Sequence, residues 1–261
     1  MSIIRQIAKS LVPPILADQI RRLRPGGALE LFAQQYLRRS YAQDGEDRVA
    51  QNFLGGPGRR DGWYVDVGAH HPGHFSNTLL FYLRGWRGIN IDAQPGSMEL
   101  FKRLRPKDTN LELGIAASEG ERTFYVYNSP EVNTFSTDVA TARADLEGLS
   151  LLRTVSVPTQ PLSKVLSTHM PAGVTIDLMS VDVEGLDLEV LKSNDWTRWR
   201  PSLVLAEDLT VVSLSNPDAS ATVLFMRNMG YVPCAKTRLT LFFAEQSRLR
   251  ESELGPWVDS R

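Results

Sequence analysis

Short apolar runs that stop at an acidic residue or a glycine recur along the chain from residue 62 onward. The runs span residues 62–68, 87–92, 109–118, 176–185 and 201–208. Runs of this length, bounded by turn residues, are typical of strands buried on both faces of a parallel sheet. The pattern therefore predicts a sheet whose strands are separated by the segments that follow.

Amphipathic segments with the period of an α-helix lie between these runs. We expect a helix that begins near Gly45 and others at 29–39, 76–85, 95–105, 161–169, 186–193 and 221–230. Residues 122–128 predict an edge hairpin after the third strand, and 231–235 with 239–245 predict a final antiparallel hairpin. Alternating strands and helices predict an α/β fold, with a mostly parallel sheet and helices on both faces.

A basic segment precedes this pattern. Residues 1–40 carry seven lysines or arginines and two acidic residues, about +5, whereas the remainder is near −6. Charged residues and Pro13-Pro14 interrupt its apolar runs, which argues against a secretory signal or a membrane-spanning helix. We expect residues 1–39 to form a basic helical extension that is solvated or makes a dimer contact. Peripheral contact with an anionic membrane is the alternative interpretation.

The composition excludes several classes of function. The net charge of −1 favours no nucleic-acid partner. Cys234 is the single cysteine, so neither an internal disulfide framework nor a multi-cysteine zinc site is available. One cysteine also suits a reducing compartment, and we expect the protein to be cytoplasmic.

Acidic residues end four of the predicted strands. They are Asp66, Asp92, Asp182 and the pair Glu207-Asp208. The carboxyl ends of parallel strands meet at one edge of a sheet, and open α/β sheets bind ligands at that edge. We therefore expect these carboxylates to share one binding site.

The turn after the first strand, Gly68 to Gly73, lacks the middle glycine of a dinucleotide-binding fingerprint. That glycine lets a pyrophosphate approach the backbone, so its absence argues against NAD or FAD. Asp92, which is 24 residues after Gly68, still suits a carboxylate that binds both hydroxyls of a ribose. A ribose site without a pyrophosphate site suggests S-adenosylmethionine.

Five segments, in order along the chain, carry a family resemblance. They are VDVGAHHPGHFSNT, GINIDAQPGSMELF, LELGIAAS, MSVDVEGLDLEVL and PSLVLAED, preceded by SYAQDGEDRVAQNFL. These segments resemble the FkbM family of S-adenosylmethionine-dependent methyltransferases over roughly residues 40–245. The resemblance implies a class I methyltransferase fold in residues 40–261, with strand order 3-2-1-4-5-7-6 and an antiparallel seventh strand. It also implies O-methylation of sugar hydroxyls in glycans, glycolipids or glycosylated natural products.

The strand positions and the resemblance together suggest cofactor-binding roles. Gly68 and Ala69 would let the turn approach the methionine part of the cofactor, and Asp66 would order that turn or reach the cofactor ammonium. Ser76 and Asn77, at a predicted helix start, would bind the cofactor carboxylate. The other expected cofactor residues are Asp92 at the ribose, Ile115 and Ala116 beside adenine, and, by resemblance only, Gln43 and Glu46.

Three of the four histidines, His70, His71 and His74, lie in the first turn. His70 is a candidate catalytic residue, because a histidine pKa near 6.5 suits a general base. The alternative is a turn whose rings only pack locally. We do not expect zinc, because adjacent residues rarely converge on one tetrahedral centre.

Asp182 and Glu207 are the main catalytic candidates, and with Asp208 they are the candidate metal ligands. Neighbouring strand ends lie about 5 Å apart, so carboxylates there repel one another unless a positive charge lies among them. Mg²⁺ would accept such oxygen ligands and would lower the pKa of a bound hydroxyl. Two alternatives stay open: a metal-free general base, and acids such as Glu184 and Asp208 that only cap helices.

Residues 129–159 are polar, and a helix at 138–148 is the regular element that we expect there. Long connections of this kind are often functional lids, so we expect a mobile insertion on the acceptor side of the site. The sequence thus predicts an O-methyltransferase that acts on a sugar-type hydroxyl of a small molecule or glycan. The alternatives are an NAD-linked sugar oxidoreductase and a non-catalytic cofactor-binding regulator, and a homo-oligomer remains open.

Overall fold

The computed structural model describes residues 33–34, 37–208, 210 and 220–248. The chain divides into two units, residues 1–39 and 40–261, and nearly all of the described residues belong to the second. The basic extension therefore lies almost entirely outside the described residues. Within the described part of the chain, no helix is long and apolar enough to cross a membrane.

A seven-stranded sheet forms the centre of the second unit, in the order β3-β2-β1-β7-β8-β10-β9. Its strands are β1 Trp63–Val67, β2 Arg87–Asp92, β3 Thr109–Glu112, β7 Leu178–Val181, β8 Leu203–Glu207, β9 Tyr231–Lys236 and β10 Thr240–Glu245. The first five of these run parallel, and β10 is antiparallel to both of its neighbours. This is the expected strand order, so the predicted class I methyltransferase fold is confirmed.

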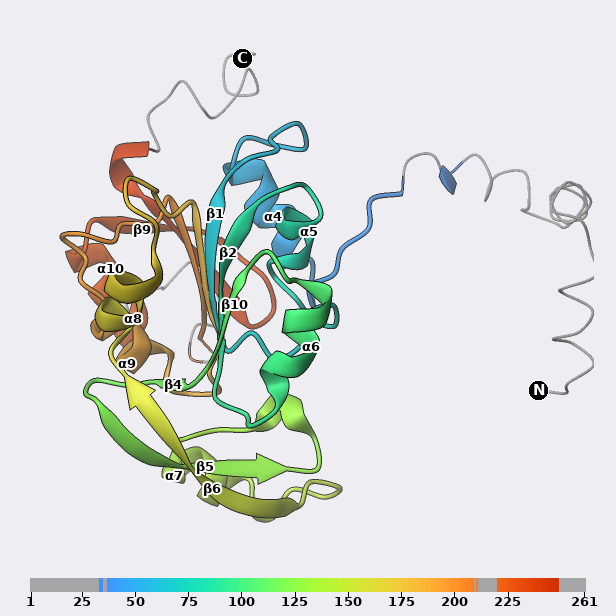
Figure 1. Ribbon diagram of the computed structural model, residues 1–261, viewed down its shortest axis with the longest axis vertical. Helices are drawn as coiled ribbons and strands as arrows, with labels where there is room; N and C mark the ends of the chain where they lie inside the picture. Colours follow the sequence, from blue (N-terminus) through green and yellow to red (C-terminus); the bar gives the residue numbers. More distant parts are fainter. Residues whose placement is uncertain (1–32, 35–36, 209, 211–219, 249–261) are drawn as a thin grey trace, which may run out of the picture. The chain divides into compact units, whose positions relative to one another are not determined.

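Helices cover both faces of this sheet (Figure 1). One face carries α8 Leu162–His169, α9 Asp187–Lys192 and α10 Ala221–Asn228, and the other carries α4 Glu46–Phe53, α5 Leu79–Tyr82 and α6 Ser97–Leu104. Side chains alternate between the two faces along each strand. Val65 and Val67 of β1 accordingly pack in the core beneath α8–α10, whereas Tyr64 packs with Phe81 and Trp86 on the other side.

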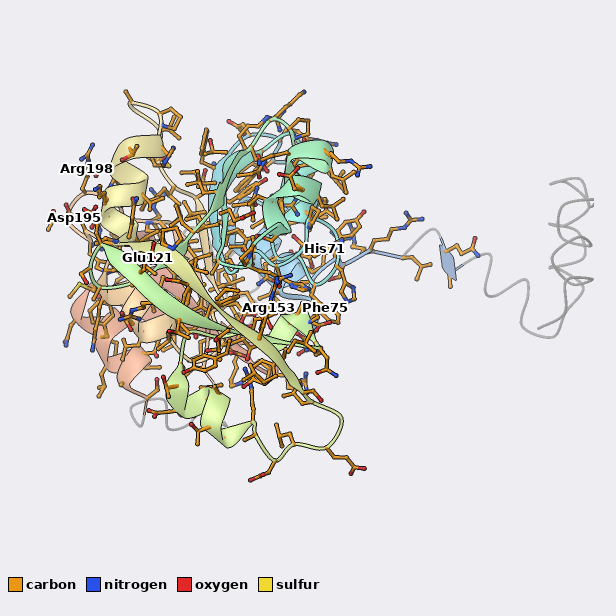
Figure 2. All side chains as sticks on the ribbon, turned by 60° about the horizontal axis from the view of Figure 1, so that its bottom comes forward. His71, Phe75, Glu121, Arg153, Asp195 and Arg198 are labelled. Carbon is orange, nitrogen blue, oxygen red and sulfur yellow. The ribbon has the colours of Figure 1, made fainter. Side chains whose placement is uncertain are left out.

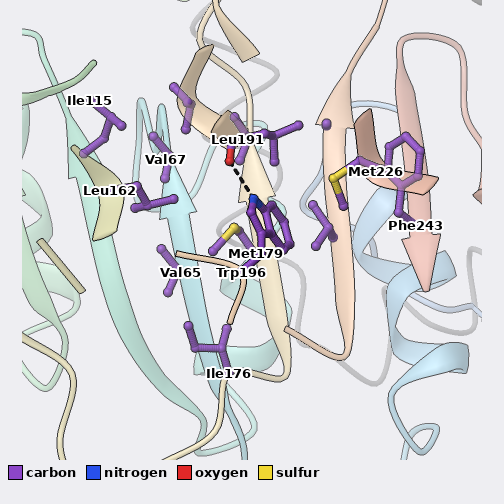
Figure 3. Packing of buried hydrophobic residues seen from close by; sticks show 14 of the residues in the cluster. Val65, Val67, Ile115, Leu162, Ile176, Met179, Leu191, Trp196, Met226 and Phe243 are labelled. Carbon is purple, nitrogen blue, oxygen red and sulfur yellow. Dashed lines mark hydrogen bonds between the residues drawn. The ribbon is translucent and has the colours of Figure 1, made fainter. Parts of the chain in front are cut away.

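The larger core is a continuous apolar layer between the sheet and α8–α10 (Figure 3). Trp196 lies within it beside Met179, and its indole Nε1 donates a hydrogen bond to the Leu191 carbonyl oxygen at 2.8 Å. Burying a polar indole group is favourable only when it finds such a partner. The strands that carry the site are therefore set on a rigid, well-packed support.

A second, three-stranded sheet follows β3, in the order β4-β6-β5. It consists of β4 Gly114–Ile115, β5 Gly120–Tyr127 and β6 Leu151–Gln160. The expected third strand at 109–118 is thus divided into β3 and β4. The edge hairpin expected at 122–128 is β5, and it pairs with the distant β6.

The segment 129–159 contains more structure than its sequence indicates. It holds a short 3₁₀ helix, Pro130–Val132, the helix α7 Thr137–Ala142, and most of β6. We expected a helix at 138–148, and α7 is shorter than that, while the strand β6 was not predicted. The first four residues of β6 are exposed and burial alternates only from Val155 onward, where Val157 and Thr159 are buried, so the pattern that marks a strand is short.

The helix expected at 76–85 is also shorter than predicted, since α5 covers Leu79–Tyr82 alone. The residues before it form a loop in which His70 and Phe75 adopt positive φ angles of 51° and 53°. Such angles are uncommon for residues other than glycine and persist only where surrounding contacts hold them. In this loop, one buried arginine supplies several of those contacts.

Arg105, which follows α6, is fully buried. Its Nε and Nη2 atoms donate to the Pro72 carbonyl oxygen at 3.1 and 2.7 Å, and Nη2 donates to Ser76 Oγ at 2.6 Å. Its Nη1 donates to Thr78 Oγ1 at 2.8 Å and to Asn90 Oδ1 at 3.2 Å. A guanidinium carries five N–H donors, and all five have a partner here.

Two carboxylates balance the charge of Arg105, and each reaches it through an intermediate side chain. No described carboxylate forms an ion pair with it; instead Thr78 Oγ1 donates to Asp66 at 2.6 Å and Asn90 Nδ2 donates to Asp108 at 3.1 Å. Burial raises the pKa of Asp66 to about 6, while the Thr78 hydrogen bond and the Arg105 charge oppose that rise. The loop, β1 and β2 are thereby tied to a single cation.

We predict that Arg105→Met lowers the free energy of unfolding by about 3–5 kcal/mol, the usual effect of removing one partner from a buried charged network. Arg103→Met is the matched control, because Arg103 is an exposed residue of α6. Urea unfolding at neutral pH measures both variants. Equal stabilities for the two variants would show that the Arg105 network contributes nothing to the fold.

Candidate active site

The loop after β1 presses against the end of β7. Gly68 has a φ of 80°, and a Cβ atom at this position would lie 1.7 Å from the Asp182 carbonyl oxygen. The amides of Gly68 and Ala69 both donate to the Ile91 carbonyl oxygen, at 2.9 and 3.0 Å. Glycine is therefore required at residue 68 by the close approach of two strand ends.

Asp92, at the end of β2, is positioned by two backbone amides. Its Oδ2 accepts a hydrogen bond from the His70 amide and its Oδ1 from the Gln94 amide, each at 2.8 Å. Burial raises its pKa, and these two hydrogen bonds oppose the rise. Each carboxylate oxygen keeps acceptor capacity for a further donor.

Asp92 lies in the wall of a cleft with about 610 Å³ of open space. The cleft is lined by apolar side chains from both sheets, namely Ile91, Leu113, Ile115, Phe124 and Phe135. Its polar rim includes Gln94 and Asn133, which are joined by a 2.7 Å hydrogen bond from Asn133 Nδ2.

A second cleft adjoins the first and is polar. Its walls include Gln43, Asp44, Glu46, Asn77 and Thr240. The two clefts share Gly68, His70, Glu131, Asp182 and Glu184. The first cleft has a mainly apolar wall and the second has a more polar one, and the two meet at the carboxyl ends of β1 and β7.

Three carboxylates gather where the clefts meet. Oxygen atoms of Asp182, Glu184 and Glu207 all lie within 4.8 Å of one another. Burial and the neighbouring Glu207 and Glu184 raise the pKa of Asp182 well above its ordinary value. Burial and Glu184 likewise raise the pKa of Glu207 to about 8. Like charges at this separation favour protonation of some members of the group.

The positive charge beside this group comes from the segment 129–159. Arg143, at the end of α7, forms an ion pair with Glu184, and its Nη1 donates to the Val132 carbonyl oxygen. Glu184 has a φ of 56°, an unusual angle for this residue type. The acid group thus combines residues of the main sheet with a cation from the segment.

A comparison with known proteins gives the family. The family model for the methyltransferase FkbM domain matches residues 66–233, which is more than half of the chain. The chain belongs to the FkbM methyltransferase family. The family predicted from the sequence motifs is therefore confirmed. No curated protein sequence matches the chain significantly.

Two solved structures are similar to this FkbM-family chain. Methyltransferase FkbM from Methylobacillus flagellatus KT is 13% identical, with a TM-score of 0.41 over 83% of this chain and 51% of that one. Precorrin-6y C5,15-methyltransferase from Geobacter metallireducens GS-15 is 14% identical, with a TM-score of 0.37 over 79% and 91% of the two chains. The chain therefore spans about half the length of the first of these proteins.

The structure divides the expected cofactor residues into two groups. Gly68, Asp92 and Ile115 line the first cleft, and Gln43, Glu46 and Asn77 line the second. Ala69, Ala116, Asp66 and Ser76 are buried away from both clefts. Ser76 and Asp66 belong to the Arg105 network, so they shape the loop and do not face a ligand.

Asp208 does not join the acid group, although we expected it to be a metal ligand. Its Oδ1 accepts hydrogen bonds from Thr210, and its Oδ2 accepts one from Ser220, whose Oγ caps α10 through the Val223 amide. Burial opposes ionisation, yet these hydrogen bonds bring the pKa of Asp208 below its ordinary value. Asp208 thus supports the Ser220 cap of α10 and is not itself the cap, and Glu184 takes the third place in the group.

The histidines of the first turn have different roles. His70 lines both clefts, in keeping with its candidacy as a catalytic residue. His71 Nδ1 accepts hydrogen bonds from the Gly73 and His74 amides, each at 2.9 Å. Figure 2 labels His71 and Phe75, and the Phe75 ring stacks on that of His74. His71 therefore supports the turn as a neutral ring, and burial lowers its pKa.

Sequence reasoning missed two arginines that organise the site. Arg105 follows a predicted helix, and Arg143 lies in a polar segment of weak periodicity. Neither is part of a motif, and a surface arginine is the usual expectation for such positions. No local signal in the sequence marks either residue.

We predict that Gly68→Ala disturbs both the fold and the site, because the new methyl group must displace the backbone of Asp182. Gly173→Ala is the control, since Gly173 has a similar φ of 76° with nothing within 4 Å of a Cβ. A positive φ costs each variant about 1–2 kcal/mol. Urea unfolding should show a further loss of about 1–3 kcal/mol for Gly68→Ala alone. Similar losses in both variants would argue against the close contact.

Proposed function

We propose that this protein transfers the methyl group of S-adenosylmethionine to a hydroxyl group of a sugar-type acceptor. The observation that carries the proposal is the meeting of an apolar cleft and an acidic cleft at Gly68, Asp182 and Glu184. The first cleft, where Asp92 lies beside an apolar wall, suits a nucleoside, and the second cleft, whose lining adds Asp44 and Glu46 to the shared carboxylates, suits a compound rich in hydroxyls. Methyl transfer requires two such ligands to meet end to end.

The first cleft fits the cofactor in its chemistry. Asp92 is held by backbone amides with acceptor capacity to spare, which suits the two hydroxyls of a ribose. Ile115 and Phe135 provide an apolar wall for a purine ring. When bound there, S-adenosylmethionine would supply a methyl group on a positively charged sulfur.

The loop amides argue against a dinucleotide. A pyrophosphate site needs backbone N–H groups that point outward at the end of the first strand. Here the amides of Gly68 and Ala69 are used by Ile91, and those of Gly73 and His74 are used by His71. This arrangement disfavours the alternative of an NAD-linked oxidoreductase.

The acid group would accept the proton of the acceptor hydroxyl. As the hydroxyl oxygen takes the methyl group in place of the cofactor sulfur, its proton would pass to a carboxylate of the Asp182 and Glu207 pair. A general base works best when its pKa is near the operating pH, and the pKa of Glu207 is raised to about 8. The pair shares its protons, so the two residues act as a unit.

Arg143 favours a metal-free mechanism, because it already supplies a positive charge to Glu184. The alternative is Mg²⁺ held by Asp182, Glu184 and Glu207, whose oxygen atoms suit a hard cation. Such an ion would hold the hydroxyl and lower its pKa. A chelator distinguishes these two mechanisms directly.

We predict that Asp92→Ala weakens binding of S-adenosylmethionine by about 10- to 100-fold, since a charge-assisted hydrogen bond contributes about 1.5–3 kcal/mol. Glu99→Ala is the control, because Glu99 is an exposed residue of α6 that forms a surface ion pair with Lys102. Calorimetry with the cofactor measures both affinities, and thermal unfolding confirms that the variants are folded. An unchanged affinity in Asp92→Ala would contradict the assigned ribose site.

We predict that Glu207→Gln and Asp182→Asn each lower methyl transfer by about 10²-fold or more while cofactor affinity persists. Asp61→Asn is the control, because Asp61 is exposed and lies just before the amino end of β1, whereas the acid group lies at the carboxyl ends of the strands. The assay follows S-adenosylhomocysteine and methyl-labelled products from candidate glycans. Wild-type rates in both variants would refute this active site, and activity lost to chelator and restored by Mg²⁺ would establish the metal alternative.

A further inference from the structure

The contact between α7 and the loop after β7 is mostly buried. The side chains of Arg143 and Glu184 are 15% and 21% exposed, so water screens their attraction only in part. Thr134 Oγ1 donates to the Glu184 carbonyl oxygen at 3.0 Å. At Gly185, a Cβ atom would lie 2.9 Å from Val139 Cγ2, so the segment fits closely over this loop.

This contact places one end of the segment on the acid group and another part on the first cleft. Asn133 and Phe135 line that cleft, and Glu131 lines both clefts. The Asn133 side chain also accepts a hydrogen bond from the Tyr127 amide at 2.8 Å, which ties the segment to β5. A substitution of Arg143 can therefore alter the lining of both clefts.

The charges around Glu207 are predominantly negative. The acidic groups that act on it or on its partner Asp182 are Asp66 of β1, Glu46 of α4, Glu184 after β7, Asp187 of α9 and Asp208 after β8. Arg143 acts in the opposite direction and lowers the pKa of Glu207. A cation from the segment thus partly offsets acids that five parts of the main fold contribute.

We infer that Arg143 is a positioning residue, which seats the segment of residues 129–159 on Glu184 and so holds Asn133 and Phe135 in the wall of the first cleft. The inference rests on the proposed function for the assignment of that cleft to the cofactor. The seating of the segment by this ion pair stands on the contacts alone. The site would then be complete only when the segment is docked.

The first test measures docking without any turnover. Hydrogen exchange of residues 130–145 should become faster in Arg143→Met and, to a similar extent, in Glu184→Gln. Arg153→Met should exchange like the wild type, because Arg153 is an exposed residue of β6 in the same small sheet (Figure 2). Wild-type exchange in Arg143→Met would overturn the seating role.

The second test measures the affinity for S-adenosylmethionine by calorimetry. Arg143→Met should weaken cofactor binding by about 10-fold, because Asn133 and Phe135 of the seated segment line the first cleft. Arg143→Lys should restore most of the affinity, and Arg153→Met should not change it. Wild-type affinity in Arg143→Met would show that the seated segment has no effect on the first cleft.

The two proposals fail in different ways. A wild-type protein that binds S-adenosylmethionine and transfers no methyl group to any hydroxyl acceptor would overturn the proposed function, and the exchange experiment would still decide the seating role. Active wild-type protein whose Arg143→Met variant exchanges like the wild type would overturn the inference and leave the proposed function intact.

Discussion

The buried guanidinium of Arg105 is the interaction on which the geometry of the site depends. A fully buried cation must satisfy every donor, because each unpaired group in the interior costs free energy. Arg105 does so by bonding to Pro72, Ser76 and Thr78 in one loop and to Asn90 on β2. The loop is thereby held against the second strand, where the His70 amide reaches Asp92. The position of the Asp92 carboxylate in the wall of the first cleft follows from this arrangement.

The residues of the site come from two parts of the chain. The main sheet delivers carboxylates, because the ends of β1, β2, β7 and β8 meet at one edge. The segment between β5 and β6 delivers Arg143, which offsets part of their mutual repulsion, together with Asn133 and Phe135 at the first cleft. Raised pKa values for Asp182 and Glu207 are the direct consequence of gathering acids in a partly buried place. Mutual repulsion makes the acid group costly to assemble. The same repulsion raises its pKa values, which suits the group to take up a proton at neutral pH.

An acid at the end of a strand is not enough to mark a site residue. Glu207 and Asp208 are adjacent, and alternation along the strand sends their side chains to different surroundings. Glu207 meets Asp182 and Glu184, whereas Asp208 binds Ser220 at the start of α10. Ser76 shows the same distinction. Its position near a predicted helix start suggested that it binds the cofactor, but its hydroxyl accepts a hydrogen bond from Arg105.

The sequence by itself determined the fold class, the order of the parallel strands, the family and the edge at which Asp92, Asp182 and Glu207 lie. These features depend on local patterns, namely the length of apolar runs, the residues that end them and motifs within short segments. Only the tertiary structure decided that Glu184 and not Asp208 completes the acid group, that β6 pairs with β5, and that Arg105 and Arg143 organise the site. Each of those outcomes is a contact between residues far apart in the chain, and such contacts depend on burial and pairing in three dimensions, which leave no periodic trace in the sequence.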